Sequence, residues 1–109
     1  MAWQATHRYA RISSRKAQLM TALIVGRDVQ DALNVLKFMP NRAAGMVSKV
    51  LTSAIANADE AEADLNRLVV AEARSDEGPT MKRMHRKDRG RMHPINKRTS
   101  HIMVAVEEE

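Results

Sequence analysis

The residues of this 109-residue chain best suited to chemistry are the cations gathered near its C-terminal end. Between positions 82 and 98 the chain carries eight lysine and arginine residues and a single acid, Asp88. Arginine presents a planar pair of donors to a phosphate, and lysine presents a compact point charge. The segment from Lys82 to Arg98 therefore predicts binding to a phosphate-bearing polymer.

A second group of cations lies near the N-terminus. Four cations and no acid occur in the first sixteen residues: Arg8, Arg11, Arg15 and Lys16. Residues 17–75 carry a net charge of −1, so the overall +5 hides two basic segments around a neutral middle. Cations that neutralise phosphates release condensed counterions, which favours a polyanion as the partner. The alternative is a solvated face that keeps the protein soluble, although such faces usually mix both signs.

The sequence offers little to an enzyme. It has no cysteine, which excludes thiolate zinc sites, disulfides and cysteine nucleophiles. It also has no phosphate-binding glycine loop, zinc-hydrolase motif or nucleophile elbow. His85 and His93 could form a metal pair, but with only Asp88 nearby, contacts to nucleic acid are the better interpretation. We predict a protein with no catalytic residues, no metal and no cofactor.

Length and composition predict one domain with a modest core. A chain of 109 residues suits a single domain, and its 44% hydrophobic content includes only three aromatic residues. No apolar run is long enough to span a membrane, and the N-terminus lacks the apolar stretch of a signal peptide. Together with the absence of cysteine, these features lead us to expect a cytoplasmic protein without a membrane partner.

Three helices are expected in the middle of the chain. Ser13 predicts the N-cap of a helix that runs to about Val25, and Asp28 marks the start of a second helix that Pro40 ends. Asn41 predicts the cap of a third and longest helix, in which apolar residues recur every three or four positions. We expect the first helix to bury one stripe of residues: Leu19, Met20, Leu23 and Ile24.

Strand-like runs flank the C-terminal basic segment. Leu68–Ser75 and Ile102–Val106 are expected to pair, and Trp3–Tyr9 is a third short strand. If the first two pair antiparallel, the residues between them form a long excursion whose turn lies near Gly90. At ~3.3 Å per residue, each arm can project roughly 40 Å beyond the body. Because proline cannot donate to a strand ladder, we predict a bulge or interrupted pairing at Pro94.

This excursion needs support from outside the protein. A two-stranded ribbon without an apolar face is marginally stable in water, and RNA, recognised mainly by shape and phosphate contacts, is the polymer that fits it best. A helix-turn-helix reading is weaker, since the third helix offers only Arg42 and Lys49 to DNA bases. Base stacking is also a weak candidate, because the three aromatic residues are scattered along the chain.

Several motifs, taken as a set, resemble one known family. The sequence EGPTMKR near the start of the excursion, the pair Gly90–Arg91 and the sequence INKRTSHI near its end occur in order. The chain is similar over almost its whole length to the large-ribosomal-subunit protein twenty-two family, and the segments that carry the resemblance are Tyr9–Ala17, Ala43–Ala44, Val50–Ala58, Glu77–Arg83, Gly90–Arg91 and Ile95–Ile102.

The resemblance implies an α+β fold, with three helices packed on a small antiparallel sheet and a long protruding β-hairpin. It implies a single domain, with a globular body of residues 1–78 plus 101–109 and an extended basic hairpin of residues 79–100. At three places the sequence departs from the family's usual pattern. Ser14 stands where the family usually has proline, and residues 85–89 and 92–94 differ from the usual tip sequence.

For function, the resemblance implies a structural constituent of the large ribosomal subunit in the cytoplasm, with no enzymatic activity. Such a protein binds large-subunit rRNA, aids its assembly and lines the polypeptide exit tunnel with its hairpin. Its expected partners are this rRNA, neighbouring large-subunit proteins such as number four, and the passing nascent polypeptide. The alternative is a free-standing RNA- or DNA-binding regulator that uses the same basic hairpin.

The resemblance and the charge pattern together select the expected site residues. The expected RNA-binding residues are Arg8, Arg11, Arg15, Lys16, Lys82, Arg83, Arg86, Lys87, Arg89, Arg91, Lys97, Arg98, Thr99, Ser100 and His101. The expected tunnel-lining tip consists of Arg86, Lys87, Asp88, Arg89, Gly90, Arg91 and Met92.

Overall fold

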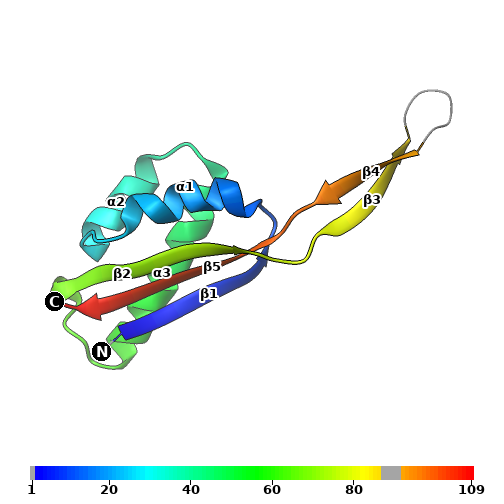
Figure 1. The fold of residues 1–109 in the computed structure, drawn as a ribbon. Helices are drawn as coiled ribbons and strands as arrows, with labels where there is room; N and C mark the ends of the chain where they lie inside the picture. The colour runs from blue at the N-terminus through cyan, green and yellow to red at the C-terminus, as the bar shows by residue number, and fades with distance from the viewer. Residues whose placement is uncertain (1, 87–91) are drawn as a thin grey trace.

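The computed structural model describes residues 2–86 and 92–109, and the side chains of residues 2–84 and 95–109. Its main sheet has three strands, β1 (Ala2–Ala10), β2 (Leu68–Glu77) and β5 (Ser100–Glu108). Their order is β1-β5-β2, so the last strand of the chain is the central one (Figure 1). Both pairings are antiparallel, which confirms the pairing predicted for the runs that flank the basic segment.

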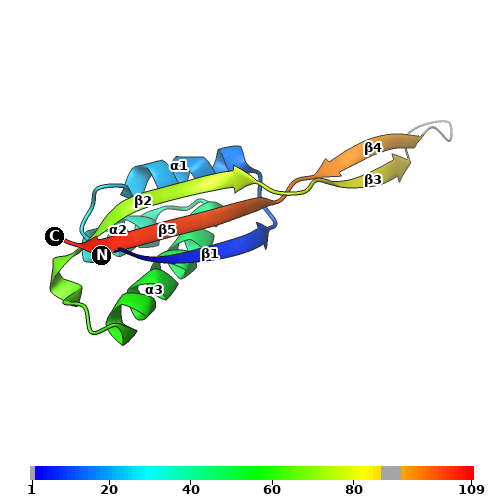
Figure 2. The same cartoon turned by 60° about the horizontal axis from the view of Figure 1, so that its bottom comes forward.

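Three helices pack behind this sheet, α1 (Ser14–Ile24), α2 (Val29–Phe38) and α3 (Arg42–Glu60), followed by a 3-10 turn, η1 (Leu65–Arg67) (Figure 2). The predicted helix starts are confirmed, because Ser13, Asp28 and Asn41 are the N-cap residues. The side-chain oxygen of Ser13 accepts a hydrogen bond from the Lys16 N–H at 3.4 Å. The α+β class is confirmed. In the part of the chain that the structure describes, no helix is both long and apolar enough to cross a membrane.

The core lies between the helices and the central strand. Ile102, Val104 and Val106 of β5 are fully buried, and they belong to one hydrophobic cluster with residues of all three helices. On α3, Val47 and Leu51 are fully buried at helical spacing. Many other core positions are alanine: Ala10, Ala17, Ala32, Ala43, Ala44, Ala54 and Ala58. Small side chains let the helices approach the sheet closely, so a chain poor in aromatic residues still closes its core.

The stripe predicted on α1 is partly wrong. Met20 and Ile24 are buried, but Leu19 is 63% exposed, and Ala17 and Thr21 complete the buried face. The buried positions follow the i, i+3, i+4, i+7 spacing of one helix face. Because α1 packs on β2, a small residue in its first turn allows a closer approach than leucine would.

Beyond the body, the chain forms a separate two-stranded antiparallel ribbon of β3 (Met81–Arg86) and β4 (Met92–Lys97). The ribbon extends away from the helices and the sheet (Figure 1), and the molecule measures 62 × 25 × 16 Å. The protruding hairpin expected from the sequence is therefore present as two paired arms. The predicted turn near Gly90 lies outside the described residues.

The bulge predicted at Pro94 is wrong. Pairing runs without a register shift from Met81 opposite Lys97 to Arg86 opposite Met92, and Pro94 stands opposite Met84. In a two-stranded ribbon each strand is an edge strand, and alternate N–H groups of an antiparallel strand point away from its partner. A proline at such a position removes no ladder hydrogen bond, so the register stays regular.

Two aliphatic residues of similar size on α1, one buried and one exposed, test which face of this helix packs in the core. We expect Ile24→Ala to lower the free energy of unfolding by about 2–5 kcal/mol, because it empties a fully buried position. We expect Leu19→Ala to change it by less than about 0.5 kcal/mol, because that side chain is mostly exposed. Urea denaturation of both variants measures the difference, and equal losses would contradict the assignment of the buried face.

Candidate nucleic-acid interface

The base of the hairpin is held by a close crossing of its two arms. The Gly78 N–H donates to the Thr99 carbonyl at 2.9 Å, and the Thr99 hydroxyl donates to the Pro79 carbonyl at 2.6 Å. A Cβ at Gly78 would lie 2.6 Å from Thr99 Oγ1, so no larger residue fits unless Thr99 moves. These contacts fix where the ribbon leaves the body.

β1 brings an aromatic residue to the same place. Its register against β5 shifts between His7 and Ala10, and Tyr9 adopts φ 58°, a conformation that non-glycine residues rarely adopt. The Tyr9 N–H donates to Nδ1 of His101 at 3.1 Å, and the two rings meet edge to face at 4.9 Å. This irregularity ends β1 beside the hairpin base, where Arg8 and Arg11 flank Tyr9 in the chain.

Three of the expected RNA-binding residues have structural contacts at this base. Thr99 and Ser100 are 5% and 0% exposed, and His101 accepts the Tyr9 N–H. The side chains of Thr99 and Ser100 are too buried to reach a phosphate at the surface, whereas His101 is partly exposed. Thr99 and His101 thus hold the hairpin base through their contacts, and the Ser100 hydroxyl is buried without a hydrogen-bond partner among the described residues.

The expected cations are exposed wherever the structure describes their side chains. On the body these are Arg8, Arg11, Arg15 and Lys16, and on the hairpin and its base they are Lys82, Arg83, Lys97 and Arg98. Among the described side chains, none of these eight forms an ion pair with a carboxylate. Their charges are therefore open to an external anion. Arg86, Lys87, Arg89 and Arg91, with the rest of the expected tip, Asp88, Gly90 and Met92, lie outside the described side chains.

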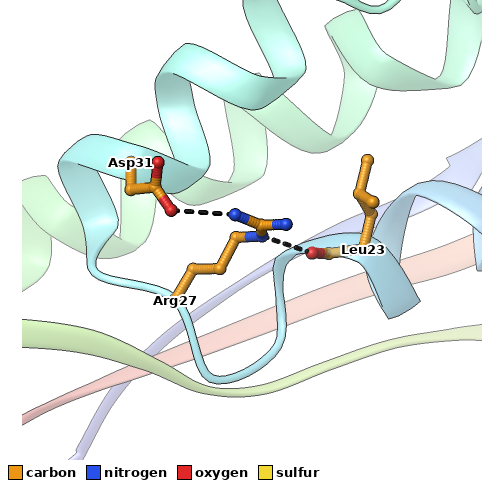
Figure 3. A network of polar contacts seen from close by, with 3 residues as sticks. All are labelled: Leu23, Arg27 and Asp31. Carbon is orange, nitrogen blue, oxygen red and sulfur yellow. Dashed lines mark hydrogen bonds and ion pairs between the residues drawn. The ribbon is translucent and has the colours of Figure 1, made fainter.

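Two arginines elsewhere on the body form ion pairs within the protein. Arg27 donates to the Leu23 carbonyl at 2.8 Å and to Asp31 at 2.9 Å (Figure 3). Its backbone carbonyl also accepts the Val70 N–H at 2.8 Å, so this loop covers an edge of β2. Arg74 lies between Glu72 and Asp76 on β2, at 3.2 Å from each. These arginines belong to the architecture of the body.

Seven acids lie at the other end of the body, although Asp76 and Glu77 lie at the hairpin base. Asp59, Glu60, Glu62 and Asp64 lie at and beyond the end of α3, and the chain ends in Glu107–Glu109. The Asp64 N–H donates to the Glu108 carboxylate at 2.7 Å, which joins these two acidic segments. The C-terminus lies on the side of the body away from the hairpin (Figure 1). A polyanion is therefore attracted to the hairpin end and repelled by the opposite end.

Two surface hollows lie beside the exposed cations. One, of about 200 Å³, is lined at the hairpin base by residues that include Ser14, Asn96, Arg98 and one acid, Glu77. The other, of about 510 Å³, lies where α1 and α3 begin, and Arg11, Lys16 and Arg42 line it. Sequence reasoning did not place Arg42 with Arg11 and Lys16. The one signal that could have found it is its place in the first turn of α3, with no acidic residue in that turn.

Substitution of Gly78 tests the contacts at the hairpin base. We expect Gly78→Ala to lower the free energy of unfolding by about 1–3 kcal/mol, because the new Cβ displaces Thr99 and its hydrogen bond. The matched control is Gly45→Ala on α3, where a Cβ meets nothing within 4 Å. It should raise the free energy by about 0.5–1 kcal/mol through helix propensity. Urea denaturation followed by circular dichroism measures both, and a neutral Gly78→Ala variant would contradict the close crossing.

The comparisons with known proteins agree with this architecture. The sequence matches the family described as ribosomal protein L22p/L17e over residues 5–107. It is 47% identical over 105 residues to the large ribosomal subunit protein uL22 of Desulfosudis oleivorans, covering 96% of this chain and 92% of the relative. It is 51% identical over 108 residues to the proteins of the same name from Thermoanaerobacter sp. and Thermoanaerobacter pseudethanolicus, covering 97% of this chain and 96% of each relative. The resemblance seen in the sequence motifs is confirmed, and the chain belongs to the ribosomal protein L22p/L17e family.

Proposed function

We propose that this protein is a structural constituent of the large ribosomal subunit that binds large-subunit rRNA and aids its assembly. The observation that carries this proposal is the gathering of exposed cations, without ion pairs among the described side chains, on the hairpin and the adjoining end of the body. The acidic opposite end orients the protein with its hairpin toward the RNA. Because the chain belongs to a ribosomal protein family, rRNA is the polyanion that this charge pattern fits. The proposed place of action is the cytoplasmic ribosome.

The hairpin is suited to burial in RNA. Lys82 and Arg83 on β3 and Lys97 on β4 are exposed, so cations lie on both strands of a ribbon that no helix covers. Cross-strand pairing sets Lys82 opposite Asn96 and Lys97 opposite Met81, which avoids opposing like charges. Ile95 is also 40% exposed. The ribbon has no core of its own, and RNA packed around it supplies the missing support and neutralises its charge.

We propose that the hairpin reaches the wall of the polypeptide exit tunnel and that residues Arg86 to Met92 form its tip there. The length of the molecule, 62 Å along its longest axis, supports this reach. In this arrangement the tip meets the nascent polypeptide and lies near large-subunit protein four. The body is residues 1–78 plus 101–109 and the hairpin is residues 79–100, with the Gly78–Thr99 crossing at their boundary. The protein acts by holding RNA and has no catalytic role.

Sedimentation tests membership of the subunit. A tagged copy of the full chain, expressed in bacterial cells, should travel with large subunits in a sucrose gradient at moderate salt. A protein that stays in the free pool and forms a stable complex with a short, defined RNA or DNA would overturn the proposal and favour a free-standing regulator. The tag is placed at the acidic C-terminus, because that end lies away from the hairpin.

Two arginine substitutions test which surface binds rRNA, one at an arginine without an ion pair among the described side chains and one at an arginine held by two carboxylates. We expect Arg98→Gln to weaken binding of the full chain to large-subunit rRNA and to reduce the salt dependence, log K against log salt, by about one. Arg74→Gln is the control, since Arg74 is held by Glu72 and Asp76. It should bind as the unmodified protein does. Filter binding over a range of salt concentrations measures both, and equal effects would argue against a localised interface.

A further inference from the structure

The groove where α1 and α3 begin combines charge with an apolar wall. Its volume is about 510 Å³, within the range of roughly 300–1,000 Å³ typical of ligand pockets. It is lined by Arg11, Ile12, Ser13, Lys16, Leu19, Asn41, Arg42 and Ala43. Three lining residues are cations, and none is acidic. Only folding brings Arg42 beside Arg11 and Lys16, because most of α1 and all of α2 lie between Lys16 and Arg42 in the sequence.

The electrostatics of this groove favour an anion. Both helices direct their N-termini toward it, because Ser13 and Asn41 are their N-cap residues and both line the groove. Helix N-termini carry a partial positive charge that adds to the three cationic side chains. The Asn41 side chain makes no capping hydrogen bond, so it is available to a ligand. The groove therefore suits one or more phosphates.

An apolar surface distinguishes this groove from a simple phosphate-binding patch. Leu19 is 63% exposed and lines the groove with Ile12 and Ala43. An exposed leucine beside three cations suits a ligand that is charged on one side and flat and apolar on the other. A nucleotide has this character, and RNA-binding proteins commonly read unpaired bases that are splayed out of a helix.

The position of the groove favours RNA over an acidic peptide. Ser13 lines it, and the next residue, Ser14, lines the hollow at the hairpin base together with Arg98 and Glu77. A single polyanion that follows the hairpin base can therefore pass over the first turn of α1, where Arg15 and Lys16 are exposed, into the groove. An acidic peptide in the groove would have to compete with RNA for this surface.

We propose that this groove holds one unpaired, extruded nucleotide of the bound rRNA. Its base lies against Leu19, and its phosphates lie against Arg11, Lys16 and Arg42. This inference rests on the proposed function and adds to it a nucleotide site on the body and a new RNA-binding residue, Arg42. The hairpin cations hold RNA by charge, whereas this groove recognises an unpaired position.

Variants of the full chain test the groove by binding to large-subunit rRNA. We expect Arg42→Gln to weaken binding about tenfold and to lower the salt dependence by about one phosphate contact. We expect Leu19→Ser to weaken binding about fivefold without changing the salt dependence, because it removes only apolar contact. The control is Lys49→Gln, an exposed cation further along α3 that lines neither hollow, and it should bind as the unmodified protein does.

Crosslinking identifies the occupant. Because the chain has no cysteine, Leu19→Cys provides a single attachment point for a photoreactive probe in assembled large subunits. The proposal expects a crosslink to one unpaired rRNA nucleotide. A crosslink to a protein, or to many nucleotides, would overturn it.

The remaining outcomes separate the groove from the proposed function. If Arg42→Gln and Leu19→Ser bind as Lys49→Gln does while Arg98→Gln binds weakly, the groove proposal fails and rRNA binding stands. If Arg42→Gln alone weakens binding, the groove takes a phosphate and no base, which also overturns the proposal. If the unmodified protein does not bind large-subunit rRNA, both proposals fail.

Discussion

The placement of the hairpin on the body depends on the close crossing of the chain at Gly78 and Thr99. On one side of it, β5 runs as the central strand of the sheet, with Ile102, Val104 and Val106 fully buried against the helices. On the other side, the residues that precede β5 in the chain form β4 of the hairpin. The well-packed body therefore anchors a ribbon that has no core. Glycine fits at this point without displacing Thr99, whereas a Cβ would meet Thr99 Oγ1 at 2.6 Å.

The hairpin base also gathers the end of β1. Tyr9 takes a strained backbone conformation that its hydrogen bond and ring contact with His101 support. As a result, the N-terminal cations, the start of α1 and the hairpin arms lie at one end of the molecule. Cations that are far apart in the sequence thus lie toward the hairpin end of the molecule, and the C-terminus and the end of α3 lie away from it (Figure 1).

The arginines of the chain divide into two groups by their contacts. Arg27 and Arg74 are held by carboxylates and carbonyls, and they stabilise a loop and the outer part of β2. Exposed ion pairs of this kind contribute only about 0–1 kcal/mol each, so the body depends mainly on its apolar core. The cations of the hairpin end form no ion pair with a carboxylate among the described side chains, so their charge is available to an external polyanion. Net charge alone does not reveal this division.

Sequence by itself determined much of this protein. Capping residues and apolar spacing located all three helices, since Ser13, Asp28 and Asn41 act within a few residues of themselves. A consecutive apolar run located β2, alternating apolar residues located β5, and the run of cations between them predicted a basic hairpin. Several short motifs that occur in the family's order along the chain identified the family, and the family match confirms it.

Tertiary structure alone decided the rest. It showed that Leu19 is exposed while Ala17 and Thr21 are buried, because the face that a helix buries depends on what it packs against. It showed that Pro94 fits a regular ladder, because the ribbon has no third strand that needs the missing N–H. It also turned Thr99 and Ser100 inward and brought Arg42 beside Arg11 and Lys16. Local sequence sets capping and periodicity over a few residues, whereas burial and the meeting of distant cations depend on long-range packing that no short segment encodes.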